Sequence, residues 1–121
     1  MGAIPRTNVG GMVYHVLNRA NERARIFRNA GDFQAFLIVL AEAKERYPMV
    51  ELFSFCVMPN HWHIVLRPKR DGEISTFMQW LTVTHSKRWR AFHRSEGYGH
   101  LYQGSITYRL GNIFVFHNLY L

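Results

Sequence analysis

Two runs of strand-forming residues stand on either side of the dipeptide Pro59-Asn60. The segments from Met49 to Met58 (MVELFSFCVM) and from His61 to Arg67 (HWHIVLR) are rich in β-branched and aromatic residues. Proline followed by asparagine favours a tight turn, because proline fixes φ and asparagine tolerates turn geometry. The sequence therefore predicts an antiparallel hairpin at the centre of the chain, and the other elements must fit around a sheet.

The rest of the chain adds two strands and two helices in a fixed order. Met12 to Arg19 is typical of a first strand, and Asn29 can cap a helix whose apolar residues recur at helical spacing until Pro48. Glu73 to His93 is the longest helical pattern, and Tyr102 to Leu110 is typical of a fourth strand. The order β-α-β-β-α-β predicts an α+β fold of the ferredoxin-like type, with an antiparallel sheet and both helices on one face. The opposite face of the sheet is then open for a ligand.

The size and charge of the chain limit its class. A length of 121 residues with 48% hydrophobic residues fits one globular domain over residues 1–121. Fifteen Lys and Arg against eight Asp and Glu give a net charge of +7, which favours a polyanionic partner, although a merely basic domain has the same balance. The single cysteine, Cys56, excludes an internal disulfide and predicts a buried, inert thiol. No apolar run approaches the roughly 20 residues of a membrane span, so we expect a cytoplasmic protein without a membrane partner.

The triplet His61-Trp62-His63 is the main candidate for chemistry. Side chains alternate along a strand, so the two imidazoles point to one face, about 7 Å apart, and can converge on a cation. Trp62, together with Ile64 and Leu66, then points to the helices as part of the core. The alternative is that both histidines are only polar residues on a solvated strand. Two histidines also leave a metal site incomplete, because a third protein ligand is normally needed.

Four blocks of this sequence resemble one known family. The stretch Cys56-Val57-Met58-Pro59-Asn60-His61-Trp62-His63 resembles the MPNHxH signature of the REP-associated tyrosine transposases, single-strand transposases of the HUH type. Three further blocks are similar to other parts of that family: Gly10 to Arg19, Phe77 to Thr82, and Gly99 to Gly104.

This resemblance implies a ferredoxin-like, metal-dependent endonuclease that acts on single-stranded DNA beside imperfect hairpins. In that family a tyrosine hydroxyl attacks a phosphodiester and leaves a 5′-phosphotyrosine link and a free 3′-hydroxyl. The resemblance makes His61 and His63 the metal ligands, and Mg²⁺ or Mn²⁺ the expected cation.

The chain departs from the family after Gly104. There the family has an acidic turn and then a helix that carries the nucleophilic tyrosine and a carboxamide ligand, whereas here the acidic turn is missing and a third helix would begin only at Asn112. Tyr120 is the candidate nucleophile, because Tyr98, Tyr102 and Tyr108 fit loop, structural and strand positions. We expect the nucleophile helix to be incomplete in this sequence. We therefore expect weak binding of Mg²⁺ or Mn²⁺ and little or no DNA cleavage.

Clusters of basic residues follow the first strand, the hairpin and the second long helix. Mixed with aromatic rings, they are typical of proteins that bind single-stranded or hairpin DNA, although a run of charge is usually just a solvated face. A non-catalytic nucleic-acid-binding module and a small metal-dependent hydrolase are the alternatives, and the sequence leaves open a monomer or a homodimer. The candidate DNA-binding residues are Arg19, Arg23, Arg67, Lys69, Lys87, Arg88 and Arg90.

Overall fold

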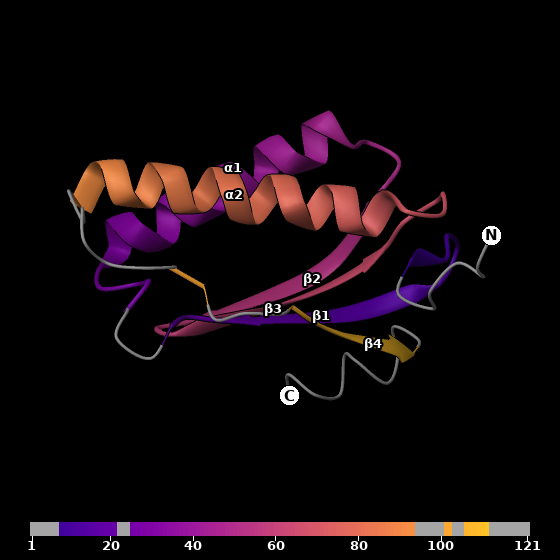
Figure 1. Ribbon diagram of the computed structural model, residues 1–121, viewed down its shortest axis with the longest axis horizontal. Coiled ribbons are helices and arrows are strands. Elements are labelled where there is room, and N and C mark those ends of the chain that lie inside the picture. Colours follow the sequence, from indigo (N-terminus) through magenta and orange to yellow (C-terminus); the bar gives the residue numbers. More distant parts are fainter. Residues whose placement is uncertain (1–7, 22–24, 94–100, 103–105, 112–121) are drawn as a thin grey trace.

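A four-stranded antiparallel sheet and two helices form the two layers of the molecule (Figure 1). The computed structural model describes residues 8–21, 25–93, 101–102 and 106–111. The strands occur in the sheet in the order β2-β3-β1-β4, and both helices cover the same face. The predicted α+β architecture is confirmed, as is the order of its elements. These elements are β1 (Val13–Arg19), α1 (Ala30–Arg46), β2 (Glu51–Met58), β3 (His61–Arg67), α2 (Glu73–His93) and β4 (Thr107–Gly111).

The central hairpin has the register that the sequence predicts. Met58 pairs with His61 across the two-residue turn, and Glu51 pairs with Arg67 at the open end. The other long edge of β3 pairs with β1, so β3 is an inner strand with a neighbour on each side. Because an inner strand is hydrogen-bonded along both edges, it is a rigid support for functional side chains.

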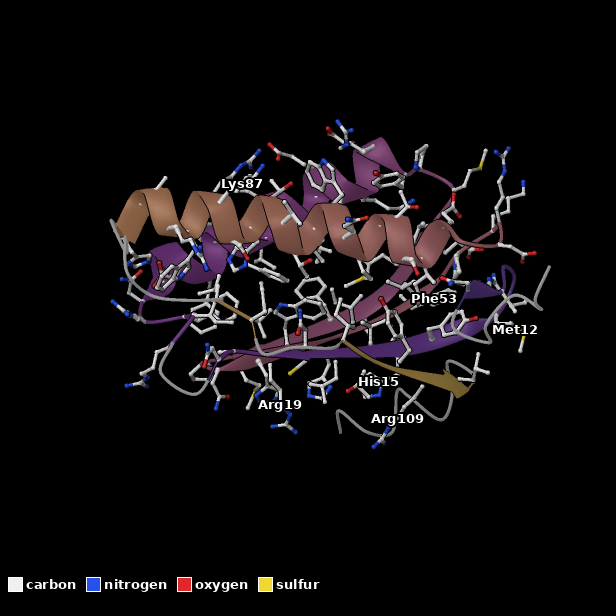
Figure 2. All side chains as sticks on the ribbon, viewed as in Figure 1. Met12, His15, Arg19, Phe53, Lys87 and Arg109 are labelled. Carbon is white, nitrogen blue, oxygen red and sulfur yellow. The ribbon has the colours of Figure 1, made fainter. Side chains whose placement is uncertain are left out.

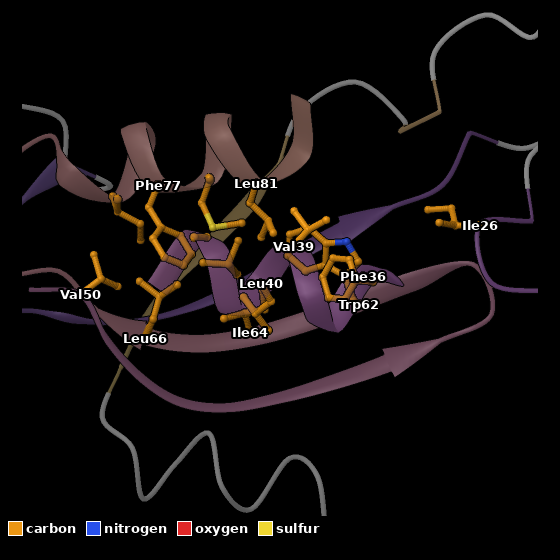
Figure 3. Packing of buried hydrophobic residues seen from close by; sticks show 14 of the residues in the cluster. Ile26, Phe36, Val39, Leu40, Val50, Trp62, Ile64, Leu66, Phe77 and Leu81 are labelled. Carbon is orange, nitrogen blue, oxygen red and sulfur yellow. The ribbon is translucent and has the colours of Figure 1, made fainter. Parts of the chain in front are cut away.

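One face of β3 forms the floor of the core. Trp62, Ile64 and Leu66 are fully buried and point toward the helices (Figure 3). Phe36 from α1 packs on the Trp62 ring at a centroid distance of 5.6 Å, and Phe77 from α2 belongs to the same buried cluster. Each of these side chains contributes roughly 1.5–3 kcal/mol of transfer free energy when it is buried. The alternation predicted for the triplet is therefore present.

The start of α1 is fixed by its cap. Asn29 is the N-cap, and its side-chain oxygen accepts a hydrogen bond from the Asp32 amide at 3.0 Å. The carboxylate of Asp32 accepts hydrogen bonds from the Arg28 amide at 3.0 Å and from His93 at 2.7 Å. Asp32 thus links the beginning of α1 to the end of α2 rather than closing a capping box on Asn29.

The fourth strand is shorter than predicted. β4 begins at Thr107, and Tyr102 makes only an isolated bridge with Ala20. The Tyr102 hydroxyl takes part in hydrogen bonds with Trp62 and His85 on the helix side of the sheet. The third helix expected from Asn112 lies outside the described residues.

The burial of two aromatic side chains on α2 does not follow their hydrophobicity. Phe92 is 79% exposed, whereas His85 occupies a buried position on that helix. Cys56 is half-buried rather than buried, with its Sγ 3.9 Å from the sulfur of Met58. Among the described helices, none is long and apolar enough to span a bilayer.

Candidate functional site

His61 and His63 lie on the face of β3 opposite the helices. Their ring centroids are 5.0 Å apart and the rings are nearly perpendicular, at 80°. Both residues are half-buried, while Trp62 between them is fully buried on the other face. The two imidazoles are therefore near neighbours on the face that the helices leave uncovered.

A third histidine joins them from the neighbouring strand. In the β1–β3 register, Leu17 pairs with His63 and His15 pairs with Val65, which places His15 on the diagonal from His63. The Nε2 of His15 is 2.7 Å from the Nδ1 of His63, and the two rings stack at a centroid distance of 4.9 Å. Sequence reasoning missed His15 as a site residue. Because side chains alternate along a strand, His15 shares a face of the first strand with Leu17 and Arg19. This alternation is the sequence pattern that could have drawn attention to it.

Asn60 orients the first histidine of the pair. The Nδ1 of His61 lies 2.8 Å from the side-chain oxygen of Asn60, which accepts the hydrogen bond. His61 must therefore carry its hydrogen on Nδ1, and its lone pair is on Nε2. Asn60 thus orients the His61 ring in addition to forming the turn, and its tendency to form turns did not predict this second role.

Burial and neighbouring cations keep these imidazoles neutral. The pKa of His63 is lowered to about 4, mainly by burial and then by the adjacent imidazoles and guanidinium groups. Burial followed by the charge of Arg109 lowers the pKa of His15, and burial followed by Arg19 lowers that of His61. At neutral pH all three rings are neutral, which is the form of imidazole that binds metal ions.

His61 and His63 are the described side chains of the predicted metal site. His61 and His63 provide two neutral nitrogen donors whose chemistry fits a divalent cation. Within residues 8–21, 25–93, 101–102 and 106–111, however, no group of three or more His, Cys, Asp or Glu side chains is arranged to hold a metal ion. The sequence-predicted nucleophile Tyr120 lies outside the described residues.

Two arginines flank the histidines on the open face. Arg19 pairs with His61 in the β1–β3 register, and Arg109 of β4 pairs with His15 on the other side of β1. Figure 2 shows His15, Arg19 and Arg109 together on the side of the sheet away from the helices. Arg109 was not among the predicted DNA-binding residues, because a single arginine on a short strand carries no signal until the register is known.

The other predicted basic residues are spread over both sides of the sheet. Arg67 stands at the far end of β3, where it pairs with Glu51 at 2.8 Å. Lys87 lies on the helix layer, away from the histidines, and Arg88 pairs with Glu42 at 2.7 Å (Figure 2). Lys69 is exposed after β3, Arg90 is half-buried on α2, and Arg23 lies outside the described residues. The described basic residues therefore lie on more than one side of the sheet, and their role in DNA binding stays a prediction.

The family of this chain follows from its similarity to known sequences. The family model described as "Transposase IS200 like" matches residues 8–110, which is most of the chain and includes β1 through most of β4. The chain belongs to the IS200-like transposases. No curated protein matches its sequence.

Two solved structures show the same fold as this IS200-like transposase. A REP-associated tyrosine transposase bound to a REP hairpin superposes with a TM-score of 0.70 at 16% sequence identity, over 98% of this chain and 68% of that one. A candidate transposase from Deinococcus radiodurans R1 superposes with a TM-score of 0.70 at 18% identity, over 99% of this chain and 93% of that one. At such low identities the structural similarity establishes the fold alone.

A buried hydrogen-bonded network supports the histidine strand in this transposase. The Trp62 indole N–H donates to the Tyr102 hydroxyl at 3.0 Å, and that hydroxyl also contacts Nδ1 of His85. Burial lowers the pKa of His85 to about 4 and raises the pKa of Tyr102, so both groups are neutral. The Tyr102 hydroxyl accepts from Trp62 and shares its second hydrogen bond with Nδ1 of His85, in a direction that the tautomer of the His85 ring sets. Trp62 is thus held in position by polar as well as apolar contacts.

Proposed function

We propose that this IS200-like transposase cuts and transfers single-stranded DNA beside a hairpin, with His61 and His63 holding Mg²⁺ or Mn²⁺. The observation that carries the proposal is the neutral, oriented histidine pair on the open face of the sheet. The side chain of Asn60 contacts Nδ1 of His61, and Nε2 of His15 contacts Nδ1 of His63. With a hydrogen on the δ nitrogen of each ring, the ε nitrogen carries the lone pair that would bind a cation, as is common for ligating histidines.

Each group of residues has a distinct task in the proposed reaction. A cation at the pair would polarise the scissile phosphodiester. Arg19 and Arg109, which flank the histidines, attract the phosphates of the strand to this face. We assign the attack to the hydroxyl of Tyr120. Its oxygen loses a proton and bonds to phosphorus, the bond from phosphorus to the 3′ oxygen breaks, and the 3′ oxygen takes up one proton, so that no net proton is released. The hairpin bound by the REP-associated transposase of the same fold supports DNA as the substrate.

A non-catalytic nucleic-acid-binding module is the second candidate. The described part of the chain contains no group of three metal-ligating side chains, and this observation favours it. Such a module would use the same sheet face and the same arginines but would form no covalent bond with DNA. The two functions therefore differ in one measurable product.

A covalent adduct distinguishes the two functions. We expect a 3′-labelled single strand carrying a hairpin to give a low yield of protein–DNA adduct with Mn²⁺, resolved on a denaturing gel. The label stays with the protein because the tyrosine bonds to the 5′ phosphate of the downstream fragment. The yield is low because two neutral ligands hold a hard cation weakly.

Two tyrosine variants complete this experiment. Tyr120→Phe should abolish the adduct, whereas Tyr108→Phe, on β4, should leave it unchanged. An adduct that survives in Tyr120→Phe would show that the assignment of the nucleophile is wrong. If the wild-type chain binds the strand but gives no adduct, the protein is a binding module.

A further inference from the structure

A cavity with both polar and apolar walls lies between α2 and the β4 side of the sheet, away from the histidines. Its volume is about 370 Å³, which is within the usual range for small-ligand sites. The walls come from the end of β1, from one side of α2 and from the segment that leads into β4. The polar and charged residues that line it are Asn18, Thr82, Ser86, Lys87, Arg90 and Tyr102.

Asn18 contributes a buried acceptor to this cavity. The residue is only 2% exposed, and within the described part of the chain its side-chain oxygen Oδ1 has no hydrogen-bond partner. Asn18 pairs with Trp62 in the β1–β3 register, so it points to the helix side, opposite His63. A buried amide oxygen without a donor is destabilising, and a ligand with an N–H group would supply the missing hydrogen bond.

Two cations on α2 border the same cavity. Lys87 and Arg90 are three residues apart on the helix and therefore lie on one side of it. Arg88 is not among the residues that line the cavity, and its guanidinium is already paired with Glu42 at 2.7 Å. The cavity thus combines positive charge at α2 with a hydrogen-bond acceptor on the sheet.

We propose that this cavity is a nucleotide subsite, which receives one nucleotide of a single-stranded DNA. Lys87 and Arg90 contact its phosphate, and Asn18 Oδ1 accepts a hydrogen bond from an amino group on the base edge. Asparagine is a common reader of bases that present an amino group, and phosphate contacts hold the strand in register. The identity of the ligand as DNA rests on the proposed function. The site itself is separate from the histidine pair, because Asn18 and His63 project from opposite faces of the sheet.

Base preference measures the role of Asn18. Oligodeoxynucleotides that differ at one position are titrated in EDTA, so that the result does not depend on a cation at His61 and His63. We expect the wild-type protein to prefer an amino-bearing base over thymine at one position by about tenfold. Asn18→Leu should lose this preference and remain as stable as the wild type, because it removes a buried unsatisfied oxygen.

Salt dependence measures the role of Lys87. Lys87→Gln should weaken binding to every oligonucleotide alike and reduce the slope of log affinity against log salt by about one unit. Arg88→Gln is the matched control from the adjacent position, and we expect its slope to stay at the wild-type value. Both substitutions are at exposed positions, so folding is preserved.

Three results would overturn the subsite. The first is an unchanged base preference in Asn18→Leu, which would mean that the cavity holds only water. The second is an equal effect of Lys87→Gln and Arg88→Gln. The third is competition by a free deoxynucleoside monophosphate as strong as that by the oligonucleotide, which would assign the cavity to a free nucleotide. Wild-type protein that binds no single strand at all would instead overturn the proposed function, and the subsite with it.

Discussion

Replacing Trp62 by alanine is expected to lower the free energy of unfolding by about 3–5 kcal/mol. The indole is fully buried, packs against Phe36 at 5.6 Å and donates a hydrogen bond to Tyr102 at 3.0 Å. Alanine would leave a cavity under β3 and take the donor away from a buried hydroxyl. Chemical denaturation monitored by far-ultraviolet circular dichroism measures the change.

Two further variants separate the sources of this loss. Trp62→Phe keeps most of the ring but not the N–H, so we expect it to cost about 1–2 kcal/mol. Phe92→Ala, at an aromatic residue that is 79% exposed, should change the stability by less than about 0.5 kcal/mol. A Trp62→Ala protein within about 1 kcal/mol of the wild type would contradict the assignment of this residue to the centre of the core.

Replacing His15 by alanine is expected to lower the affinity for Mn²⁺ by about 10- to 100-fold, although His15 is not assigned as a ligand. When His63 coordinates through Nε2, its Nδ1 carries the hydrogen and donates to His15 Nε2, 2.7 Å away. Loss of this acceptor frees the His63 ring and lowers its basicity. The concentration of free Mn²⁺, read from its electron paramagnetic resonance signal, gives the affinity even when binding is weak.

Two other substitutions test the specificity of that effect. His15→Gln supplies a carbonyl oxygen as an alternative acceptor and should recover most of the affinity. His93→Gln changes a histidine that pairs with Asp32 at the other side of the molecule, and we expect no change in Mn²⁺ binding. If His15→Ala binds Mn²⁺ like the wild type, His15 does not orient the ligand.

Local sequence patterns were sufficient to predict the hairpin and the position of the histidine pair on it. The turn at Pro59-Asn60 fixes where β3 begins. Because side chains alternate along a strand, one buried residue then determines which residues of β3 face the helices and which face the other way. Trp62 supplied that residue, so His61 and His63 could be placed on the open face without a structure. The bounds predicted for β3 and α2 agree with those observed.

Local patterns could not predict the contacts between strands that are distant in the sequence. His15 and Arg109 reach the histidine pair only through the β1–β3 and β1–β4 registers, which no local pattern encodes. The Tyr102 hydroxyl likewise bonds to groups on β3 and α2 that are distant in the sequence. The DNA-binding role of the basic residues stays a prediction, since a charge pattern on a helix does not tell which side of the sheet that helix covers.

The central claim is that His61 and His63 hold a divalent cation where the open face of the sheet binds DNA. Mn²⁺ binding is measured by electron paramagnetic resonance for the wild type and for His61→Ala/His63→Ala, each mixed with the same hairpin-bearing single strand. We expect the wild-type complex to bind Mn²⁺ beyond the amount held by the DNA, and the double variant to bind the strand without that additional ion. Equal Mn²⁺ binding by the two proteins would contradict the claim.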